Sequence, residues 1–368
     1  MDQDDTAQII CSLKELRQKK GYTQSELANM LGIKRQAVYD IESGRYLPNT
    51  LIALRLSRIL NVTVEDIFKE KLSSTKEVEL MEDAPVESRV SVVKVREKYI
   101  GYPIKNKDVI SGEIQTADGL YKGGGKIHLI KREDIIDNTL ALLGCDPAFN
   151  IVSTYITTSE SSMHYRFASS KNALESLAQG RAHVAGTHMH SVNGSDANIE
   201  YAQKIMGSQK IGVVAFAEYE EGFIVAPGNP LNIKGVEDLT RSNVRFVNRE
   251  PGAALRFFLE DMLLENKIPF SSVEGFDKCV YSHAEGAQLV EFGLADVALG
   301  LRSLAEIYNV GFVPLSSVNS DLIIPADLWD IRPVKMLIDA LQIKRLRLEL
   351  QSIAGYNTDN TGKIIKQP

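Results

Sequence analysis

The sequence predicts a multidomain chain, in which a small all-α domain is followed by a larger α/β domain built of two lobes. Three observations lead to this fold class. Helix caps and apolar residues at helical spacing fill the first 68 residues, a polar and acidic stretch covers residues 69–88, and strand and helix patterns alternate from about residue 126. A chain of 368 residues, 44% of them hydrophobic, is long enough to give each domain its own core.

The segment 23–42, TQSELANMLGIKRQAVYDIE, predicts two short helices joined by a tight turn. Thr23 and Glu26 form a capping box that starts the first helix, and Gly32 ends it. Two helices with a glycine in the turn form a helix-turn-helix motif; a small packing or dimerisation unit is the alternative interpretation. The side chains that the second helix exposes suit phosphates and base edges in a DNA major groove: Lys34, Arg35, Gln36 and Tyr39.

Further helices are expected around this motif. Apolar spacing predicts one ahead of it, with Ile9 and Leu13, a leucine-rich one over 50–60, and a last short one that begins at Thr63. Five helices in this arrangement resemble the XRE class of DNA-binding domain, to which Cro and phage repressors belong. The resemblance covers residues 8–68 and is carried by Leu16, Arg17, Gly21, Thr23, Gln24, Leu27, Ala28, Ile41, Glu42, Gly44, Pro48, Leu54 and Leu60.

The XRE resemblance implies roles for single residues. It implies that Gln24 holds a DNA phosphate, and that the positions facing DNA are Lys34, Arg35, Gln36 and Tyr39. One such motif reads only a few base pairs, so a symmetric pair reading two half-sites is expected. The expected partners are therefore a double-stranded DNA operator and a second copy of the chain in a homodimer.

The charge of the chain is distributed unevenly. The formal net charge is −6, which excludes a general nucleic-acid binder. Residues 14–58 nevertheless hold nine basic and four acidic side chains, a local net charge of +5. A solvated basic face would give the same count. The basic charge indicates DNA binding because it coincides with the helix-turn-helix.

Several features argue against other protein classes. The N-terminus, MDQDD, has no apolar signal segment, and no apolar run approaches the roughly 20 residues that span a bilayer. Cys11, Cys145 and Cys279 show neither disulfide nor metal-ligand spacing. His188 and His190 would share one face of a strand, but no further spacing completes a metal site. We expect a cytoplasmic protein without a membrane partner, metal or cofactor.

Residues 69–88, KEKLSSTKEVELMEDAPVES, predict a linker because they are polar and acidic. Residues 89–125 predict a small β-containing connecting segment, with one strand in RVSVVKVREKYIGYPI and a turn cluster in TADGLYKGGG. No Gly-Lys-Ser/Thr follows the three glycines, so we expect a flexible joint there rather than a phosphate loop.

Residues 126–365 predict the two-lobed α/β domain, with mostly parallel sheets. The strand patterns are IHLIK, FNIVSTYI, AHVAGTH, KIGVVAF, VRFVN, CVYS, ADVALGL and FVPL. The helix patterns are REDIIDNTLALLG, SSKNALESLAQG, GAALRFFLEDMLLE and HAEGAQLVEFG.

Polar residues gather at three expected strand-to-helix junctions of this domain, at residues 168–171, 246–256 and 281–283. A helix N-terminus presents free N–H groups and a positive dipole end, and the carboxyl ends of strands form the ligand crevice of open α/β sheets. The sequence therefore predicts a site for a small anion. The alternative at each junction is ordinary N-capping by Ser169, Ser170 and Ser282.

The same junctions carry a second resemblance. FVNREPGAALRFFLEDML, AQGRAHVAGTHMHS with DAN after it, SHAEGAQLVEFGLADVALGL and AGYNTDNTGKI resemble the periplasmic-binding-protein-like domain of molybdate-type one-component regulators. The resemblance runs from about residue 90 to 365. It implies ligand-binding residues in one lobe, Ser169, Ser170, Thr187 and His188, and in the other, Asn248, Arg249, Gly252, Ala253, Ser282 and His283.

The chain departs from the related pattern at one place. Where that pattern reads Asn-Arg-x-Pro-Gly-Ser-Gly-Thr-Arg, this chain has Ala253, Ala254 and Leu255 in place of Ser-Gly-Thr. Two hydroxyl donors are lost, and a buried dianion needs many donors. Two kinds of ligand are therefore expected as alternatives. One is a molybdate- or tungstate-like oxyanion, and the other is a larger organic anion, such as one of the molybdenum-cofactor or pterin type.

The resulting hypothesis is a ligand-responsive transcription regulator, in which an anion closes two lobes and changes operator binding. An enzyme with a fused DNA-binding domain is one alternative, although no nucleophile–base pair or phosphate loop appears in the sequence. A constitutive repressor whose C-terminal domain only oligomerises is the other, and ligand-induced thermal stabilisation would separate it from the first.

Overall fold

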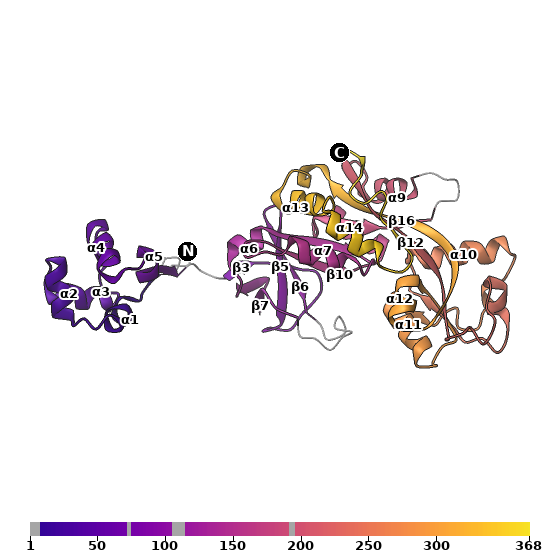
Figure 1. Ribbon diagram of the computed structural model, residues 1–368, viewed down its shortest axis with the longest axis horizontal. Helices are drawn as coiled ribbons and strands as arrows, with labels where there is room; N and C mark the ends of the chain where they lie inside the picture. The colour runs from indigo at the N-terminus through magenta and orange to yellow at the C-terminus, as the bar shows by residue number, and fades with distance from the viewer. Residues whose placement is uncertain (1–7, 72–74, 105–114, 191–195) are drawn as a thin grey trace. The chain divides into compact units, whose positions relative to one another are not determined.

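The computed structural model describes residues 8–71, 75–104, 115–190 and 196–368 of the chain (Figure 1). The chain divides between Lys76 and Glu77 into two compact units, which are described separately below. In the described residues, no helix is both long and apolar enough to cross a membrane.

The N-terminal unit contains the helices expected from the sequence. They are α1 (Leu13–Lys19), α2 (Gln24–Leu31), α3 (Arg35–Glu42), α4 (Thr50–Leu60) and α5 (Val64–Ile67). Their inward faces form one buried cluster that includes Leu13, Leu27, Leu31, Val38, Ile41, Leu56 and Leu60. The expected first helix is wrong at its start, because strand β1 (Gln8–Cys11) pairs antiparallel with β2 (Phe68–Lys71).

Local capping explains where these helices begin and end. Thr23 and Glu26 form the reciprocal capping box of α2, and Gly32 follows the helix in the left-handed conformation, with φ +71°. The side chain of Asn49 caps α4, and Thr63 with Asp66 repeats the capping box at α5. The starts of α2, α4 and α5 are thus set by residues close in sequence.

A six-stranded sheet has the order β3-β8-β7-β5-β6-β4; its first strand begins two residues ahead of the division, and its other strands belong to the C-terminal unit. Its strands are β3 (Thr75–Glu77), β4 (Glu79–Leu80), β5 (Arg89–Val95), β6 (Lys98–Pro103), β7 (Gly119–Gly123) and β8 (Lys126–Leu129). The linker expectation for 69–88 is therefore wrong at β3 and β4, and the single strand expected after it is a hairpin of β5 and β6. The expected turn cluster contains β7. Residues 72–74 and 105–114 lie outside the described residues.

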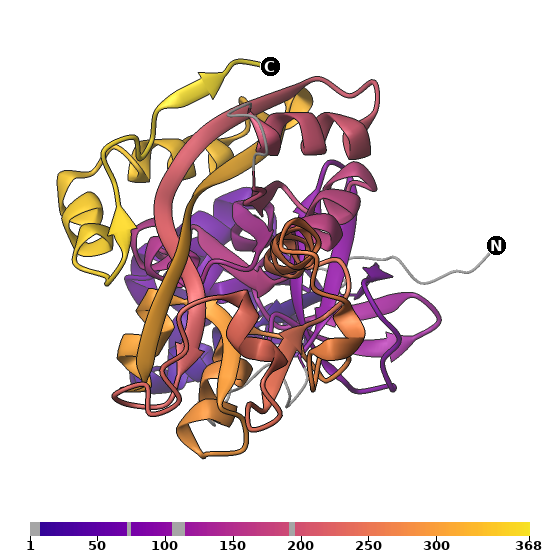
Figure 2. The ribbon, with the colours of Figure 1, turned by 90° about the vertical axis from the view of Figure 1, so that its right-hand side faces the viewer.

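The second sheet of this unit has ten strands, in the order β10-β9-β11-β16-β12-β15-β13-β14, with β17 and β18 paired to β12. Strands β12 (Ile211–Val225) and β16 (Gly311–Pro325) are 15 residues long and antiparallel. They run side by side as a long curved pair through both halves of the sheet (Figure 2). They are the strands that join the two lobes.

The first lobe is built on β9 (Thr139–Gly144), β10 (Ser162–Phe167) and β11 (Val184–Thr187). Its helices are α7 (Phe149–Ile156), α8 (Ser170–Ala178), α9 (Ala197–Met206), α13 (Arg332–Ala340) and α14 (Lys344–Gln351), whereas α6 (Glu133–Asp137) packs on the six-stranded sheet through Ile136. Both faces of β9 are buried, since Leu140 and Leu142 pack with α7 while Ala141 and Leu143 pack with α8.

The second lobe is built on β13 (Phe246–Arg249), β14 (Cys279–Val280) and β15 (Val297–Leu301). Helices α10 (Ala254–Glu265), α11 (His283–Glu291) and α12 (Arg302–Ile307) cover it. Short helical turns η2 (Val236–Thr240), η3 (Phe270–Ser272) and η4 (Ala326–Leu328), and strands β17 (Tyr356–Asn357) and β18 (Ile364–Lys366), complete the unit. The expected α/β fold with two lobes is thus confirmed. The expectation of mostly parallel sheets is wrong, because the long strands β12 and β16 pair antiparallel with each other and with their neighbours, and parallel pairs are confined to the outer strands of each lobe and to β4 with β6.

Two expected elements of the first lobe are wrong. Residues 149–156, FNIVSTYI, form helix α7 and not a strand, because Phe149, Val152 and Ile156 bury one helical face against the sheet. Residues 132–144 form the short α6 and then strand β9, and not one helix. The run TLALLG is apolar at every position, so its pattern does not distinguish a buried helix from a central strand.

His183 connects the two sheets of this unit. Its Nδ1 accepts a hydrogen bond from the backbone N–H of Ala141 at 3.0 Å, and its Nε2 donates to the carbonyl oxygen of Lys94 at 3.1 Å. The neutral ring satisfies both contacts, whereas a second ring proton would face the N–H of Ala141. Burial lowers the pKa of His183 to about 4, and the charge of Arg96 acts in the same direction.

We expect His183 to make the stability of this unit depend on pH. Between the folded pKa of about 4 and the ordinary value of 6.5, the unfolded chain binds more protons than the folded one, so stability falls as pH falls. Urea unfolding at pH 6.5 and pH 5 should show a loss of about 1.5 kcal/mol from this residue. His183→Gln should weaken this dependence, and His128→Gln, at an exposed histidine, should retain it. Equal pH dependence in all three proteins would contradict the assignment.

Candidate functional site

Helix α3 presents the side chains that the sequence predicts for DNA contact. Lys34 is its N-cap residue, and Lys34, Arg35, Gln36 and Tyr39 are all exposed. Gln36 Nε2 donates to Asp40 Oδ1 at 3.1 Å, one turn along the helix. The guanidinium of Arg45 lies 5.8 Å from the centre of the Tyr39 ring. The opposite face of α3 is buried through Val38 and Ile41, so the exposed face is fixed by the core.

Gln24 is engaged within the helical unit. Its Nε2 donates to Glu42 Oε2 at 2.9 Å, and the same carboxylate receives Nε of Arg17 at 2.5 Å and Nη2 at 3.2 Å. Burial alone would raise the pKa of Glu42, but the hydrogen bonds from Arg17 and Gln24 lower it overall. This buried ion pair ties α1 and α2 to the end of α3.

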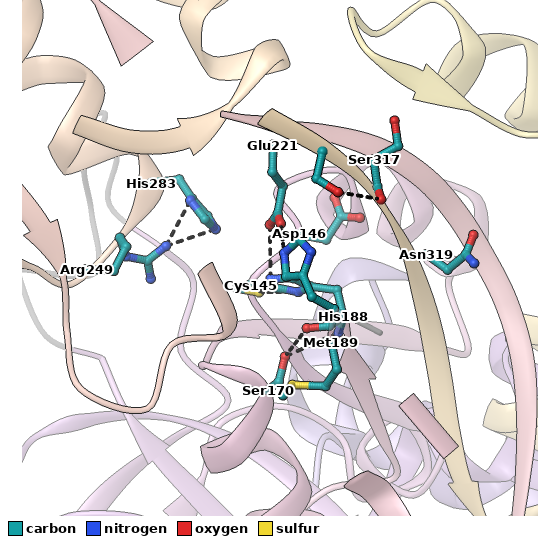
Figure 3. A network of polar contacts seen from close by, with 12 residues as sticks. Cys145, Asp146, Ser170, His188, Met189, Glu221, Arg249, His283, Ser317 and Asn319 are labelled. Carbon is teal, nitrogen blue, oxygen red and sulfur yellow. Dashed lines mark hydrogen bonds and ion pairs between the residues drawn. The ribbon is translucent and has the colours of Figure 1, made fainter. Parts of the chain in front are cut away.

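In the C-terminal unit, polar side chains from both lobes converge between the lobes (Figure 3). Cys145 follows β9 and His188 follows β11 in the first lobe, while Arg249 ends β13 and His283 begins α11 in the second. Glu221 comes from the crossing strand β12. All five are buried, so the cleft between the lobes is closed around them.

The contacts in this network are short. Cys145 Sγ lies 3.2 Å from Nδ1 of His188, whose Nε2 lies 3.3 Å from Glu221 Oε1. The other carboxylate oxygen of Glu221 lies 2.6 Å from Nε2 of His190. In the second lobe, Arg249 Nη1 lies 2.8 Å from Nδ1 of His283.

The charges of Arg249 and Glu250 balance each other, because the guanidinium forms a two-point ion pair with the carboxylate, at 2.9 and 3.0 Å.

Burial favours the neutral forms of three neighbouring groups. It raises the pKa of the Cys145 thiol, and it lowers the pKa of His188 to about 4 although Glu221 acts in the opposite direction. Burial also lowers the pKa of His283, with Arg249 adding to the effect. At neutral pH the network therefore contains a neutral thiol and two neutral imidazoles.

A cavity of about 420 Å³ lies beside this network, and both lobes line it. Lys171, Glu175, Met189, His190, Tyr201, Lys204 and Ile205 come from the first lobe, and Ala254, Phe257, Phe258 and Asp261 from the second. The rings of His190 and Phe258 stack across the lobes, with centroids 3.9 Å apart and planes 8° from parallel. This volume suits a small organic molecule rather than a bare ion.

The structure brings together part of the expected ligand set. Ser170 Oγ accepts from the backbone N–H of His188 at 3.2 Å, and a ligand atom of His188 lies within 4.8 Å of one from His283. Thr187 Oγ1 is buried and makes no hydrogen bond to the described residues. The Asn248 side chain donates instead to the carbonyl oxygen of Phe276.

The remaining expected residues lie at helix starts. The hydroxyls of Ser169 and Ser282 cap α8 and α11, as the capping alternative proposed. Gly252 has φ +92° and precedes Ala253, the N-cap of α10, where no side-chain cap is formed by the described residues. Of the three expected anion-binding helix starts, α10 is thus the one whose N-cap side chain leaves the first N–H groups uncapped.

Sequence reasoning missed several residues of the site. Cys145 and Glu221 carry no local motif, and each meets His188 only after the chain folds. In the sequence, His190 suggests only a metal ligand and its stacking partner Phe258 only a position in a helix. The sequence offers one signal for Cys145, which is its position. It directly follows an apolar run that ends in glycine, and such a position is typical of the end of a buried strand.

Two family models match the chain. One is described as a PBP superfamily domain and matches residues 155–342, and the other is a helix-turn-helix model that matches residues 13–67. The chain is 25% identical over 351 residues to the uncharacterized protein YvgK of Bacillus subtilis (strain 168), covering 95% of this chain and 99% of YvgK.

Further similarity is found for each part of the chain. Over 56 residues the chain is 41% identical to YgzD of Bacillus subtilis (strain 168), an uncharacterized HTH-type transcriptional regulator, covering 15% of this chain and 85% of YgzD. Among solved structures, Peb3 from Campylobacter jejuni aligns with a TM-score of 0.41 and 17% identity, covering 59% of this chain and 99% of Peb3.

Proposed function

Since the chain belongs to the PBP superfamily and has a helix-turn-helix domain ahead of its PBP domain, we propose that it is a ligand-responsive transcription regulator. The helix-turn-helix domain binds a double-stranded operator, as part of a homodimer. A small molecule binds between the two lobes and changes the affinity for that operator. The observation that carries this proposal is the closed cleft, in which buried polar groups of both lobes meet beside Glu221 of the crossing strand β12.

The build of the cleft favours coupling between ligand binding and the arrangement of the two lobes, because few elements join the lobes. Strands β12 and β16 cross between the lobes, and the pairing of both strands is irregular between Ala215 and Ala217 and between Glu221 and Gly222. Such irregularities bend a strand locally. A ligand that contacts both lobes would favour the closed arrangement by its differential affinity for the closed and open states. Glu221 lies at one of these irregularities and also contacts His188 and His190.

We propose an anionic ligand, on the strength of two features. Arg249 is 1% exposed and is the buried cation of the network, and α10 begins without a side-chain cap. Glu221 and Glu250 limit the positive charge of the cleft, and Ala253, Ala254 and Leu255 provide no hydroxyl donors. These features favour an organic anion that also fills the aromatic cavity over a compact dianion such as molybdate.

For DNA binding, we expect Gln36→Ala and Lys34→Ala to behave differently. Gln36 is exposed near the start of α3, and a bidentate base contact contributes about 1–3 kcal/mol of discrimination. Gln36→Ala should therefore weaken operator binding and relax its sequence preference. Lys34→Ala should weaken cognate and scrambled DNA alike and reduce the salt dependence. Fluorescence anisotropy with both duplexes at several salt concentrations measures this, and equal losses for both variants on both duplexes would refute the role of Gln36.

A further inference from the structure

Three side chains of metal-binding type meet at the centre of the cleft. Cys145, His188 and His283 each place one ligand atom within 4.8 Å of the other two. The thiol is 5% exposed and each imidazole is 3% exposed. Cys145 and His188 follow two strands of the first lobe, and His283 begins helix α11 of the second.

The separations suit a tetrahedral ion. Zinc binds a cysteine sulfur at about 2.3 Å and a histidine nitrogen at about 2.0–2.1 Å, so two such ligands on one ion lie about 3.5 Å apart. Cys145 Sγ and His188 Nδ1 are 3.2 Å apart, close to that value. One sulfur and two imidazole nitrogens favour zinc and its neighbours in the transition series over magnesium or calcium.

Glu221 occupies the position of a supporting carboxylate. Nε2 of His188 lies 3.3 Å from Glu221 Oε1, while Cys145 Sγ lies 3.2 Å from Nδ1 and 3.9 Å from Nε2 of the same ring. This oxygen is fully buried and accepts no hydrogen bond from the described residues. A carboxylate that receives the second ring N–H of a ligating histidine is a recurrent partner of metal sites, since it fixes the tautomer and the ring orientation.

The charges of the cleft also favour a divalent cation. The charge of Arg249 is balanced by Glu250, and among the described residues the buried carboxylate of Glu221 contacts two histidines and no arginine or lysine. A divalent ion that binds the Cys145 thiolate, with release of its proton to solvent, offsets the negative charges of the thiolate and of Glu221. Burying an unbalanced charge is costly, so this balance stabilises the closed cleft.

We propose that the cleft binds one divalent transition-metal ion of the zinc class through Cys145 Sγ, His188 Nδ1 and one ring nitrogen of His283, which exchanges its contact with Arg249 Nη1 for the ion. The ion joins the two lobes, because His283 belongs to the second lobe and the other two ligands to the first. Three protein ligands leave a fourth position for water or for an oxygen of a bound anion. This inference goes beyond the proposed function and does not depend on DNA binding.

Cobalt(II) titration of the reduced, chelator-treated full-length chain tests the site. We expect one equivalent to produce the thiolate-to-cobalt charge-transfer band and the visible d–d bands of a tetrahedral ion, both displaced by zinc. Cys145→Ser should abolish the charge-transfer band. Glu221→Gln should retain the band but weaken cobalt binding by about 10–100-fold, as loss of a supporting carboxylate does.

Cys279→Ser is the matched control, because Cys279 is a partly buried thiol of the second lobe, 3.3 Å from Arg256 Nη1. It should titrate like the wild type, and Cys11→Ser in the helical unit should do the same. Zinc should raise the melting temperature of the wild type and of both controls but not that of Cys145→Ser, whose fold is checked by circular dichroism. No charge-transfer band in the wild type, or a band that persists in Cys145→Ser, would overturn the proposal.

Discussion

Glu42→Ala is expected to abolish operator binding by unfolding the helix-turn-helix unit. The Glu42 side chain is 4% exposed and receives hydrogen bonds from Arg17 and Gln24, while Arg17 also donates to the carbonyl oxygen of Tyr22. Removal of one partner of a buried pair leaves the other charge uncompensated and costs about 3–5 kcal/mol. A unit of this size has a total stability of only about that amount.

Hydrogen exchange over residues 13–67 of the full-length chain measures this loss. The double variant Arg17→Met/Glu42→Met should recover much of the protection, because apolar side chains of similar volume can replace a buried ion pair. Glu65→Ala, at an exposed position of α5, should exchange like the wild type. Wild-type protection in Glu42→Ala would show that the pair contributes little to the fold.

Replacement of Arg249 is expected to abolish the ligand response while operator binding survives. Arg249 is the buried cation of the cleft, and a hydrogen bond to a charged group contributes about 1.5–3 kcal/mol, or about 10–150-fold in affinity. Because Arg249→Ala alone would strand Glu250, the test variant is Arg249→Met/Glu250→Gln, which removes the pair without a net change in charge.

Arg256 and Glu260 provide the matched control for this variant. They form a second arginine–glutamate pair in the same lobe, with Nε and Oε1 2.8 Å apart, and Arg256 lies within α10. Arg256→Met/Glu260→Gln should keep the response. Calorimetry with molybdate, tungstate and pterin-type anions gives the affinities, and we expect both oxyanions to bind more weakly than the organic anion. Submicromolar molybdate binding would refute the argument from the missing hydroxyls at residues 253–255.

The helix-turn-helix unit could be predicted because its signals are local. The capping box of Thr23 and Glu26 and the left-handed Gly32 act over a few residues, and the structure places α2 and α3 within one residue of expectation. The segment 149–156 could not be predicted, since β-branched residues favour a strand there while burial against β9 and β10 selects a helix. Packing with segments far along the chain overrode the local preference.

The candidate site was predictable only as a region. The strand ends that hold His188, Arg249 and His283 were expected to converge, because the carboxyl ends of parallel strands meet at one edge. Cys145 and Glu221 were missed, since 43 residues separate Cys145 from the His188 ring that it contacts, and 33 separate Glu221 from it. The closure of the two lobes depends on contacts between segments that are distant in the chain. The spacing of residues within one segment therefore does not predict it.

The link between cleft and operator can be measured directly. The full-length chain selects a duplex from a random DNA pool, and the dissociation constant of that duplex is measured with the cleft empty and with it saturated by whichever tested anion binds. We expect at least a tenfold difference in the wild type and in Arg256→Met/Glu260→Gln, and none in Arg249→Met/Glu250→Gln. An unchanged dissociation constant in the wild type, with calorimetry showing a saturated cleft, would contradict the proposal that this chain couples ligand binding to DNA binding.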